Sequence, residues 1–257
     1  VEEMRAPILL LGILDDGWAG LSDAARQRLT TADVVIGAGR TLELVRPHLP
    51  ATAILKDMDG LLGQVPGWIS AARDAGQTVV ALATGDPLCH GIASWLTGKL
   101  GRDGFEILPA VSTLQQAFAR FKTPWQDIKI STCHSADAGE WFVGATPAHG
   151  LYKLMRAIAL HPRVALFTGP DNNPARLARA LITAGYGDEV KLSVACRLNM
   201  ADEEVFAGLS TVDAIIGNNL KSRFSVSTPT FDMTLQPGSF YRLDDPQQTC
   251  SAERLRG

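Results

Sequence analysis

The chain has 257 residues, of which 46% are hydrophobic and 20% charged, and this balance excludes collagen-like, disordered and coiled-coil proteins. Its length corresponds to one large domain or two modest ones, enough to bury a substantial core. Twenty-four basic and 27 acidic side chains give a net charge of −3, so no overall positive field exists and nucleic acid is not an expected partner.

The cysteines and the apolar runs indicate the cellular compartment of the protein. The four cysteines are far apart, without a CxxC pair, which fits neither a zinc site nor a dense disulfide framework: Cys89, Cys133, Cys196 and Cys250. Scattered thiols are typical of a reducing cytosol, and no metal site is expected. The apolar run Ile8–Leu14 follows Glu2 and Glu3, unlike a signal peptide, and no segment approaches the roughly 20 apolar residues that cross a bilayer. We therefore expect a soluble, cytoplasmic protein without a membrane partner.

The first half of the chain alternates predicted strands with predicted helices. Strands are expected at Ile8–Leu14, Val34–Ile36, Thr78–Ala83 and Phe105–Leu108. Helices are expected after the N-cap Ser22, at Thr41–Val45, Val65–Ala75 and Leu88–Leu100, and from near Ser112. This alternation predicts a parallel sheet with crossover helices.

The second half continues the alternation after a link at Arg120–Trp125. Strands are expected at Ile128–Thr132, Arg163–Thr168, Val190–Cys196 and Phe224–Ser227, with edge pairing at Met233 and Leu235. Helices are expected at Leu151–Leu160 and Pro174–Ala184. The fold class is therefore α/β with two domains, each a mainly parallel or mixed sheet flanked by helices. We place the domains at residues 1–120 and 121–235, followed by a tail at 236–257.

Ligands of open parallel sheets bind at the carboxyl ends of the strands, so the loops after the strands carry the information on function. After the first strand, Leu14, Asp15 and Asp16 stand where a dinucleotide fingerprint would place glycines. The two carboxylates would repel a phosphate, which disfavours nicotinamide cofactors.

The loop Thr84–Gly91 has the composition of a ligand-binding turn. Gly85 permits close backbone approach, and Pro87 fixes the next turn. The following helix offers free N–H groups that could donate hydrogen bonds to a ligand carboxylate. The alternative is a plain turn with Asp86 as the helix N-cap.

A set of motifs in a fixed order points to one family. Gly85-Asp86-Pro87, followed by Gly91, resembles the loop of the tetrapyrrole methylases, which are class III S-adenosylmethionine methyltransferases. The other matching segments, in chain order, are residues 11–21, 35–42, 109–113, 131–134, 167–174, 196–198 and 202–203. The Asp-Asp-Gly-Trp-x-Gly-Leu opening and the Ser-x-x-His motif are most similar to the C5-methylating group of the cobalamin pathway. The resemblance covers roughly residues 7–235.

The resemblance implies two α/β domains with S-adenosylmethionine folded into the cleft between them. The cofactor contacts that it implies are Gly85, Asp86, Pro87, His90, Ser112, Thr113, Phe167 and Leu198. Taken alone, Ser112 and Thr113 read as N-caps and Leu198 reads as core.

Methyl transfer from a sulfonium mainly needs in-line alignment and exclusion of water, with one modest base for the proton that is lost. His134, at the end of the strand Ile128–Thr132, is the first candidate because its unperturbed pKa lies near neutrality, and Asp16 is the second. A surface or capping histidine is the alternative. Arg40 and Arg120 are expected to bind the carboxylates of the substrate, although a lone arginine is often simply solvated.

The expected function is methylation of a precorrin or cobalt-precorrin at C5, with S-adenosylhomocysteine as the product. A homodimer is expected from the family. A fused decarboxylating C15 domain would need more chain, so a separate CbiT-type C15-methylating protein is a further expected partner. The chain departs from the family pattern at Leu14, at His90 and in the longer stretch Ser135–Gly150. These departures leave open a non-catalytic binding or scaffold protein, or a methylase with another acceptor such as a peptide or ribosomal RNA.

Overall fold

The computed structural model describes residues 7–186 and 190–209, and it divides the chain into two compact units. The first unit ends at Thr113 and the second begins at Leu114, so helix α5 (Thr113–Phe121), which we had placed before the boundary, falls almost wholly in the second unit. The predicted strand Phe224–Ser227, the edge pairing at Met233 and Leu235, and the tail 236–257 lie outside the described residues.

The first unit is built on a parallel sheet. Its strands are β1 (Ile8–Ile13), β2 (Val34–Gly37), β3 (Ile54–Asp57), β4 (Val79–Thr84) and β5 (Phe105–Leu108). Their order is β3-β2-β4-β1-β5, with all four pairings parallel. β1 is buried along its whole length, as its continuous apolar sequence predicts for a strand covered on both faces.

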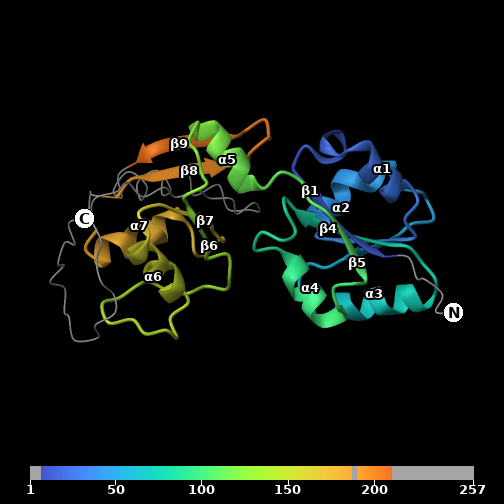
Figure 1. The fold of residues 1–257 in the computed structure, drawn as a ribbon, viewed down its shortest axis with the longest axis horizontal. Helices are drawn as coiled ribbons and strands as arrows, with labels where there is room; N and C mark the ends of the chain where they lie inside the picture. Colours follow the sequence, from blue (N-terminus) through green and yellow to red (C-terminus); the bar gives the residue numbers. More distant parts are fainter. Residues whose placement is uncertain (1–6, 187–189, 210–257) are drawn as a thin grey trace. The chain divides into compact units, whose positions relative to one another are not determined.

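Helices cover both faces of this sheet (Figure 1). They are α1 (Asp23–Thr30), α2 (Gly39–Val45), α3 (Val65–Asp74) and α4 (Ile92–Leu100), with short 3₁₀ turns η1 (Gly17–Gly20), η2 (Arg46–His48) and η3 (Leu62–Gln64). Leu29 of α1 packs with Leu9 and Leu11 of β1, whereas Leu96 of α4 packs with Ile8 and Leu10 on the other face. The predicted parallel sheet flanked by crossover helices is confirmed (Figure 1).

The strand order creates a switch point between β1 and β4. The chain leaves β1 through α1 toward β2 on one side, and it leaves β4 through α4 toward β5 on the other. Because the two outgoing loops diverge, the carboxyl ends of β1 and β4 border the crevice in which open α/β sheets bind ligands.

The starts of two helices in the first unit have local causes. Ser22 caps α1 as predicted, because its Oγ accepts a hydrogen bond from the backbone N of Ala25 at 3.2 Å. Helix α4 begins at Ile92, four positions after the predicted start at Leu88. The intervening loop has positive φ angles at Gly85 (+67°) and His90 (+53°), which a helix cannot contain.

In its described part, the second unit contains two pairs of strands. β6 (Lys129–Thr132) and β7 (Val164–Phe167) are parallel, and β8 (Leu192–Cys196) pairs antiparallel with β9 (Glu204–Leu209). Its helices α6 (Tyr152–Leu160) and α7 (Pro174–Thr183) bury Leu154, Ile158, Leu177 and Leu181 in one core with β7. Trp141, in the long stretch 135–150, joins this core. Within residues 7–186 and 190–209, none of the helices is long and apolar enough to span a bilayer.

Candidate functional site

The carboxyl edge of the first sheet is joined backbone to backbone. The Gly85 N–H donates to the carbonyl of Ile13 at 2.9 Å, and the Ala110 N–H donates to the carbonyl of Gly85 at 3.2 Å. A Cβ on Gly12 would lie 2.1 Å from the Gly85 oxygen and 2.3 Å from the Ala110 nitrogen. Gly12 is therefore required by close approach, a constraint that the sequence analysis did not identify.

The Gly85 loop is a self-contained turn. Asp86 Oδ1 accepts a hydrogen bond from the N–H of Leu88 at 2.9 Å, and the Pro87 carbonyl accepts one from the N–H of Ala93 at 3.1 Å. The N-cap of α4 is Gly91, so Asp86 caps the turn and does not cap the helix, contrary to the alternative considered above.

The loops after β4 and β5 meet at this edge. Ser112 and Thr113 are buried, and the side chain of Ser112 hydrogen-bonds the Cys89 thiol. Partial burial and the Asp86 carboxylate raise the pKa of Cys89. Of the predicted cofactor residues, the structure thus brings Gly85, Asp86, Pro87, Ser112 and Thr113 together, with His90 exposed at the end of the same loop.

The same edge exposes two large apolar side chains. Leu88, after β4, is 56% exposed, and Val111, after β5, is 48% exposed. Small-molecule sites are lined mainly by apolar side chains, so Leu88 and Val111 are candidates to contact a ligand. Neither residue was singled out from the sequence.

Asp15 and Asp16 lie in the turn after β1, and Arg40 lies in the first turn of α2, which follows β2. Arg40 Nη1 forms an ion pair with Oδ1 of Asp15, whose side chain is only 8% exposed. The positive charge of Arg40 is therefore already balanced within the protein. The carboxylate of Asp16 is exposed and lies over Gly20, where a Cβ would come within 2.3 Å of it.

His134 lies at the carboxyl end of β6 in the second unit, as predicted. Its N–H donates to Thr132 Oγ1 at 3.1 Å, and a Cβ on Gly169 would lie 3.4 Å from its Nδ1. Desolvation of the ring lowers the pKa of His134, and a hydrogen bond to the backbone of Thr168 partly opposes this shift. The imidazole is therefore neutral at pH 7 and able to accept a proton.

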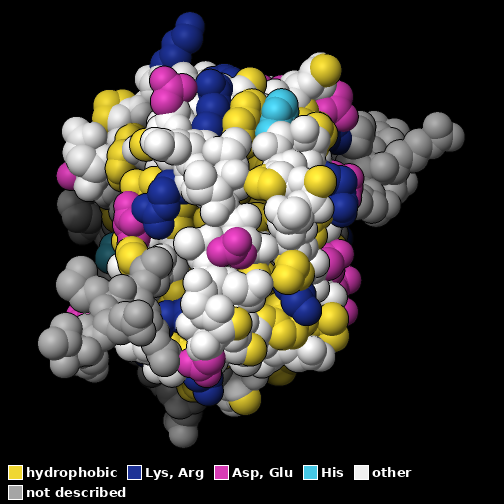
Figure 2. Space-filling model, turned by 90° about the vertical axis from the view of Figure 1, so that its right-hand side faces the viewer, with side chains coloured by type: hydrophobic (Ala, Val, Ile, Leu, Met, Phe, Trp, Pro, Cys, Tyr) yellow, Lys and Arg dark blue, Asp and Glu magenta, His cyan; other side chains and the backbone are white. Residues whose placement is uncertain are grey.

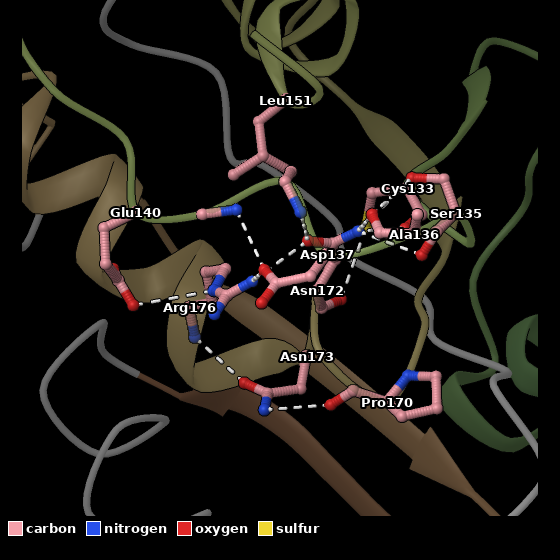
Figure 3. A network of polar contacts seen from close by, with 12 residues as sticks. Cys133, Ser135, Ala136, Asp137, Glu140, Leu151, Pro170, Asn172, Asn173 and Arg176 are labelled. Carbon is pink, nitrogen blue, oxygen red and sulfur yellow. Dashed lines mark hydrogen bonds and ion pairs between the residues drawn. The ribbon is translucent and has the colours of Figure 1, made fainter.

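Phe167 lies beside the chain that leads to His134, because the carbonyl of Phe167 accepts a hydrogen bond from the N–H of Cys133 at 2.8 Å. The segment that follows β6 is held by a buried amide, that of Asn172 (Figure 3). Its side chain contacts the carbonyls of Cys133 and Ala136. Asn172 lies within the matching segment 167–174, and no role was predicted for it from the sequence.

Arg120 and Leu198 belong to a third group, formed by α5 and the loop after β8. Arg120 forms a bidentate ion pair with Glu203, with Nε–Oε1 at 2.5 Å and Nη2–Oε2 at 3.0 Å. It also donates a hydrogen bond to Asn199 Oδ1 at 3.1 Å. This pairing raises the pKa of Arg120 and lowers that of Glu203. Leu198 is buried in an apolar cluster with Ala117 of α5, so its side chain packs in the core.

The sequence is similar to a protein family and to several proteins of known name. The sequence model of the Tetrapyrrole (Corrin/Porphyrin) Methylases matches residues 7–212. The cobalt-precorrin-7 C(5)-methyltransferase of Salmonella typhimurium is 28% identical over 199 residues, which are 76% of this chain and 89% of that protein. The decarboxylating precorrin-6Y C(5,15)-methyltransferase of Sinorhizobium sp is 29% identical over 208 residues. That match covers 77% of this chain and 44% of the relative, so the chain spans less than half of that longer enzyme.

Solved structures share the fold. A cobalt precorrin-4 methyltransferase superposes with a TM-score of 0.67 at 20% identity, covering 89% of this chain and 93% of that one. The uroporphyrin-III C-methyl transferase of Thermus thermophilus, in complex with S-adenyl homocysteine, superposes with a TM-score of 0.58 at 18% identity, covering 90% and 92%. The match over residues 7–212 and the two-unit α/β fold lead to one conclusion: the chain belongs to the tetrapyrrole (corrin/porphyrin) methylases, a family of S-adenosylmethionine-dependent methyltransferases.

Proposed function

We propose that this protein transfers a methyl group from S-adenosylmethionine to C5 of a precorrin or cobalt-precorrin ring in cobalamin biosynthesis. The observation that carries the proposal is the similarity to the Salmonella typhimurium protein named cobalt-precorrin-7 C(5)-methyltransferase, which extends over most of both chains. The activity follows from the chemistry of two regions, the loops at the carboxyl edge of the first sheet and the His134 segment.

The loops of the first unit suit a sulfonium nucleoside better than a dinucleotide. S-adenosylmethionine carries a positive sulfonium and no phosphate, so the carboxylates of Asp16 and Asp86 favour it where they would repel a pyrophosphate. Leu88 and Val111 offer apolar surface to an adenosyl group. The residues that we propose to hold the cofactor in this unit are Gly85, Asp86, Pro87, His90, Ser112 and Thr113, and those in the second unit are Phe167 and Leu198. Leu198 would act through its backbone, because its side chain is core.

Bound S-adenosylmethionine supplies a methyl group that is already electrophilic, with a neutral leaving group. The protein's share is to align the ring carbon with that methyl group and to exclude water, which is worth about 7 to 11 kcal/mol in well-oriented reactions. His134, neutral at pH 7, then takes the proton that the methylated ring position loses. Asp16 is the second candidate for this step.

The substrate carries many carboxylates, and we assign their recognition to Arg40 before Arg120. Arg40 pairs with Asp15 and its side chain is 34% exposed, so it can reach a substrate carboxylate while it keeps this pair. Arg120 makes a two-pronged pair with Glu203 and a third bond to Asn199, and exchanging these would cost more.

Titration calorimetry with S-adenosylhomocysteine and a methylation assay test the proposal together. Under anaerobic conditions, the protein is incubated with ¹³C-methyl-labelled S-adenosylmethionine and either precorrin-7 or cobalt-precorrin-7. A new ¹³C-methyl resonance at C5 is expected. Asp86→Ala should weaken binding of S-adenosylhomocysteine, whereas Asp23→Ala, whose side chain is fully exposed on α1, should not. No binding at millimolar concentration would remove the proposal.

A second acceptor position is supported by one relative. The cobalt-precorrin-4 C(11)-methyltransferase of Methanocaldococcus jannaschii is 28% identical over 188 residues, 71% of each chain. The same assay, run on a C11-unmethylated precorrin, distinguishes the two positions. Binding of S-adenosylhomocysteine without transfer to any tetrapyrrole would instead favour a non-catalytic binding protein.

An RNA acceptor is disfavoured by the charge pattern. On the face of the molecule in Figure 2, Lys and Arg side chains are interspersed with Asp and Glu, and neither sign forms a continuous field there. Binding to a nucleic acid backbone draws on clustered positive charge. We further propose that the protein works as a homodimer, which light scattering after size exclusion would test.

A further inference from the structure

We propose that Asn172 is a positioning residue of the methylation site, because its buried amide fixes the segment 133–138 that presents His134. This inference rests on the proposed function, in which His134 accepts a proton. It concerns a residue that does not touch the reacting atoms and acts through the backbone of its neighbours.

The amide nitrogen of Asn172 binds on both sides of His134. Nδ2 donates to the carbonyl of Cys133 at 3.0 Å and to the carbonyl of Ala136 at 3.0 Å, with longer contacts to Ser135 O and Oγ at 3.4 and 3.3 Å. Cys133 precedes His134 and Ala136 follows it by two positions. Figure 3 shows Asn172 bonded to Cys133 and to Ala136. These two short bonds therefore tie down the chain on either side of His134 in the sequence.

The amide oxygen continues the same network. Oδ1 accepts a hydrogen bond from the N–H of Ala138 at 3.0 Å and another from Arg176 Nη1 at 3.3 Å. The backbone carbonyl of Asn172 accepts hydrogen bonds from the Gly169 N–H at 3.3 Å and from the Cys133 thiol at 3.5 Å. Asn172 thus links the loop after β7 to the loop after β6.

An amide is the chemical group that this position needs. The Asn172 side chain is 0% exposed and offers both donors and acceptors in one short plane. An aspartate of the same shape would turn a negative oxygen toward the carbonyls of Cys133 and Ala136. An aliphatic residue would leave those carbonyls without this donor, and buried polar groups that lose a partner are costly.

The charges in the network are paired with one another. Arg176 Nη1 forms an ion pair with Asp137 Oδ1, and Arg176 Nε lies 3.5 Å from Glu140 Oε1. Both acidic groups have lowered pKa values, for which hydrogen bonds to Gly139 and to Arg176 or Arg179 are the causes. Burial raises the pKa of the Cys133 thiol to about 12, so it stays neutral. The ring of His134 itself faces the backbone of Thr168 and Gly169.

Asn173 provides a matched control. It is the same residue type at the next position, and it caps α7, with Oδ1 accepting from the Arg176 N–H at 3.0 Å and Nδ2 donating to Pro170 O at 3.3 Å. These two bonds of the Asn173 side chain stay within the loop after β7 and the first turn of α7, outside the segment 133–138. Asn173→Ala should therefore lower thermal stability and leave His134 as it is.

The test compares Asn172→Asp, Asn172→Ala and Asn173→Ala with the wild-type protein. The titration of His134 is followed by ¹⁵N–¹H spectra of the imidazoles, and its signal is assigned by its absence in His134→Gln. In the wild-type protein the midpoint should lie below 6.5, the ordinary value. In Asn172→Ala it should rise toward that value, because the segment is no longer held and the ring leaves the backbone of Thr168 and Gly169. In Asn172→Asp the new carboxylate raises it as well, so the alanine variant is the decisive one. The turnover number should fall at least about tenfold, with the KM for S-adenosylmethionine within about twofold, and the loss should persist at about pH 8.

Folded Asn172 variants with an unchanged His134 midpoint would overturn the inference. So would an Asn173→Ala variant that shifts His134 as far as the Asn172 variants do. If the wild-type protein transfers methyl groups and the Asn172 variants do so equally fast, the inference fails while the proposed function stands. If the wild-type protein transfers no methyl group, the proposed function fails, and so does the role of Asn172 in turnover. The titration of His134 then still decides whether Asn172 holds that residue in place.

Hydrogen exchange of the wild-type protein decides the case in which neither Asn172 variant folds. The Ala138 N–H donates to Asn172 Oδ1, and it should exchange as slowly as the core of the second unit although it belongs to a loop. Exchange of this N–H at the rate of a free loop would overturn the inference.

Discussion

The two strand ends that carry the candidate chemistry are built in opposite ways. At the edge of the first sheet, the backbones of Gly12, Gly85 and Ala110 touch without any intervening side chain. At the end of β6, one buried residue, Asn172, joins two loops: its side chain bonds to the loop after β6, and its backbone carbonyl accepts a bond from Gly169 in the loop after β7.

This difference separates holding a ligand from presenting a reactive group. A glycine edge brings backbone groups and exposed apolar side chains such as Leu88 and Val111 to the surface, which suits a cofactor that is bound by shape. A side-chain network fixes one loop so that a single group, His134, keeps its orientation. The predictions below test each half of this comparison, beginning with the largest effect.

Gly12→Ala should be the most damaging single change in the first unit. Its Cβ would lie 2.1 Å from the Gly85 oxygen, and backbone atoms on both sides leave no flexible side chain to move. We expect a loss of about 3 kcal/mol in the free energy of unfolding, together with loss of S-adenosylhomocysteine binding. Urea unfolding and calorimetry measure the two effects.

Gly98→Ala is the control for this variant. Gly98 lies within α4 and a Cβ there would meet nothing within 4 Å, so alanine should stabilise the protein by about 0.5 to 1 kcal/mol. A Gly12→Ala protein as stable as the wild type would show that the edge tolerates a side chain.

His134→Gln should lower the turnover number by about 10²-fold, the low end of the range for a general base, because methyl transfer needs little proton chemistry. The lowered pKa of His134 fixes the sign of the pH dependence. The neutral base predominates above its pKa, so wild-type turnover should fall only below pH 6.5, and this acidic limb should be absent in the variant. His161→Gln, in the loop after α6, serves as the control.

Protonation of His134 also bears on stability. Its folded pKa is depressed, so the unfolded chain binds the proton more readily, and stability should decline as pH falls from 6.5 toward the folded value. His134→Gln should flatten this decline. Identical pH profiles of stability in both proteins would mean that the ring is fully solvated.

Gly85→Ala should cost roughly 1 to 2 kcal/mol, because its φ of +67° is strained for any residue with a Cβ. Space is not the cause, since the nearest atom to that Cβ would be 3.5 Å away. Gly76→Ala, with a φ of +70° at the end of α3, should lose similar stability. Only Gly85→Ala should also weaken S-adenosylhomocysteine binding, by about tenfold. Equal affinities would place the cofactor away from this loop.

The elements that sequence predicted well are those whose pattern comes from burial. β1 and β4 are continuous apolar runs because helices cover both faces, and this signal is local. β3 and β9 were missed. Both carry exposed or half-buried residues, such as Ile54 at 44% and Val205 at 38%, so their sequences lack a continuous apolar run, and β3 is also only four residues long.

The candidate site divides in the same way. The order of the loops followed from the strand alternation, and Gly85, Asp86 and Pro87 stood out as turn residues. Asn172 did not, because between Asp171 and Asn173 it reads as an ordinary loop residue. Its role depends on contacts with residues 36 to 39 positions earlier, which only the fold brings together.

Arg120→Lys should have the smallest effect. It tests whether Arg120 binds the substrate or forms a structural ion pair that holds the loop after β8, which we call the clasp. Lysine keeps the positive charge and loses the fork onto Glu203 and the bond to Asn199. The two side chains are 35% and 22% exposed, so solvent screening limits the expected loss to under about 1 kcal/mol. Arg46→Lys, in the more exposed pair with Glu43, should change stability by close to zero.

The pH dependence of this small loss identifies its source. Arg120 lowers the pKa of Glu203, so the pair stabilises the fold above the ordinary value of 4.5 and its contribution disappears as pH falls through the lowered value. The difference between wild type and Arg120→Lys should therefore be present at pH 7 and vanish in acid. The loop that the clasp holds contains positive φ angles at Arg197 (+50°) and Asn199 (+67°), which need such external support. A raised KM for the tetrapyrrole with unchanged stability would instead make Arg120 a carboxylate-binding residue, because only then would the lost bonds belong to the substrate.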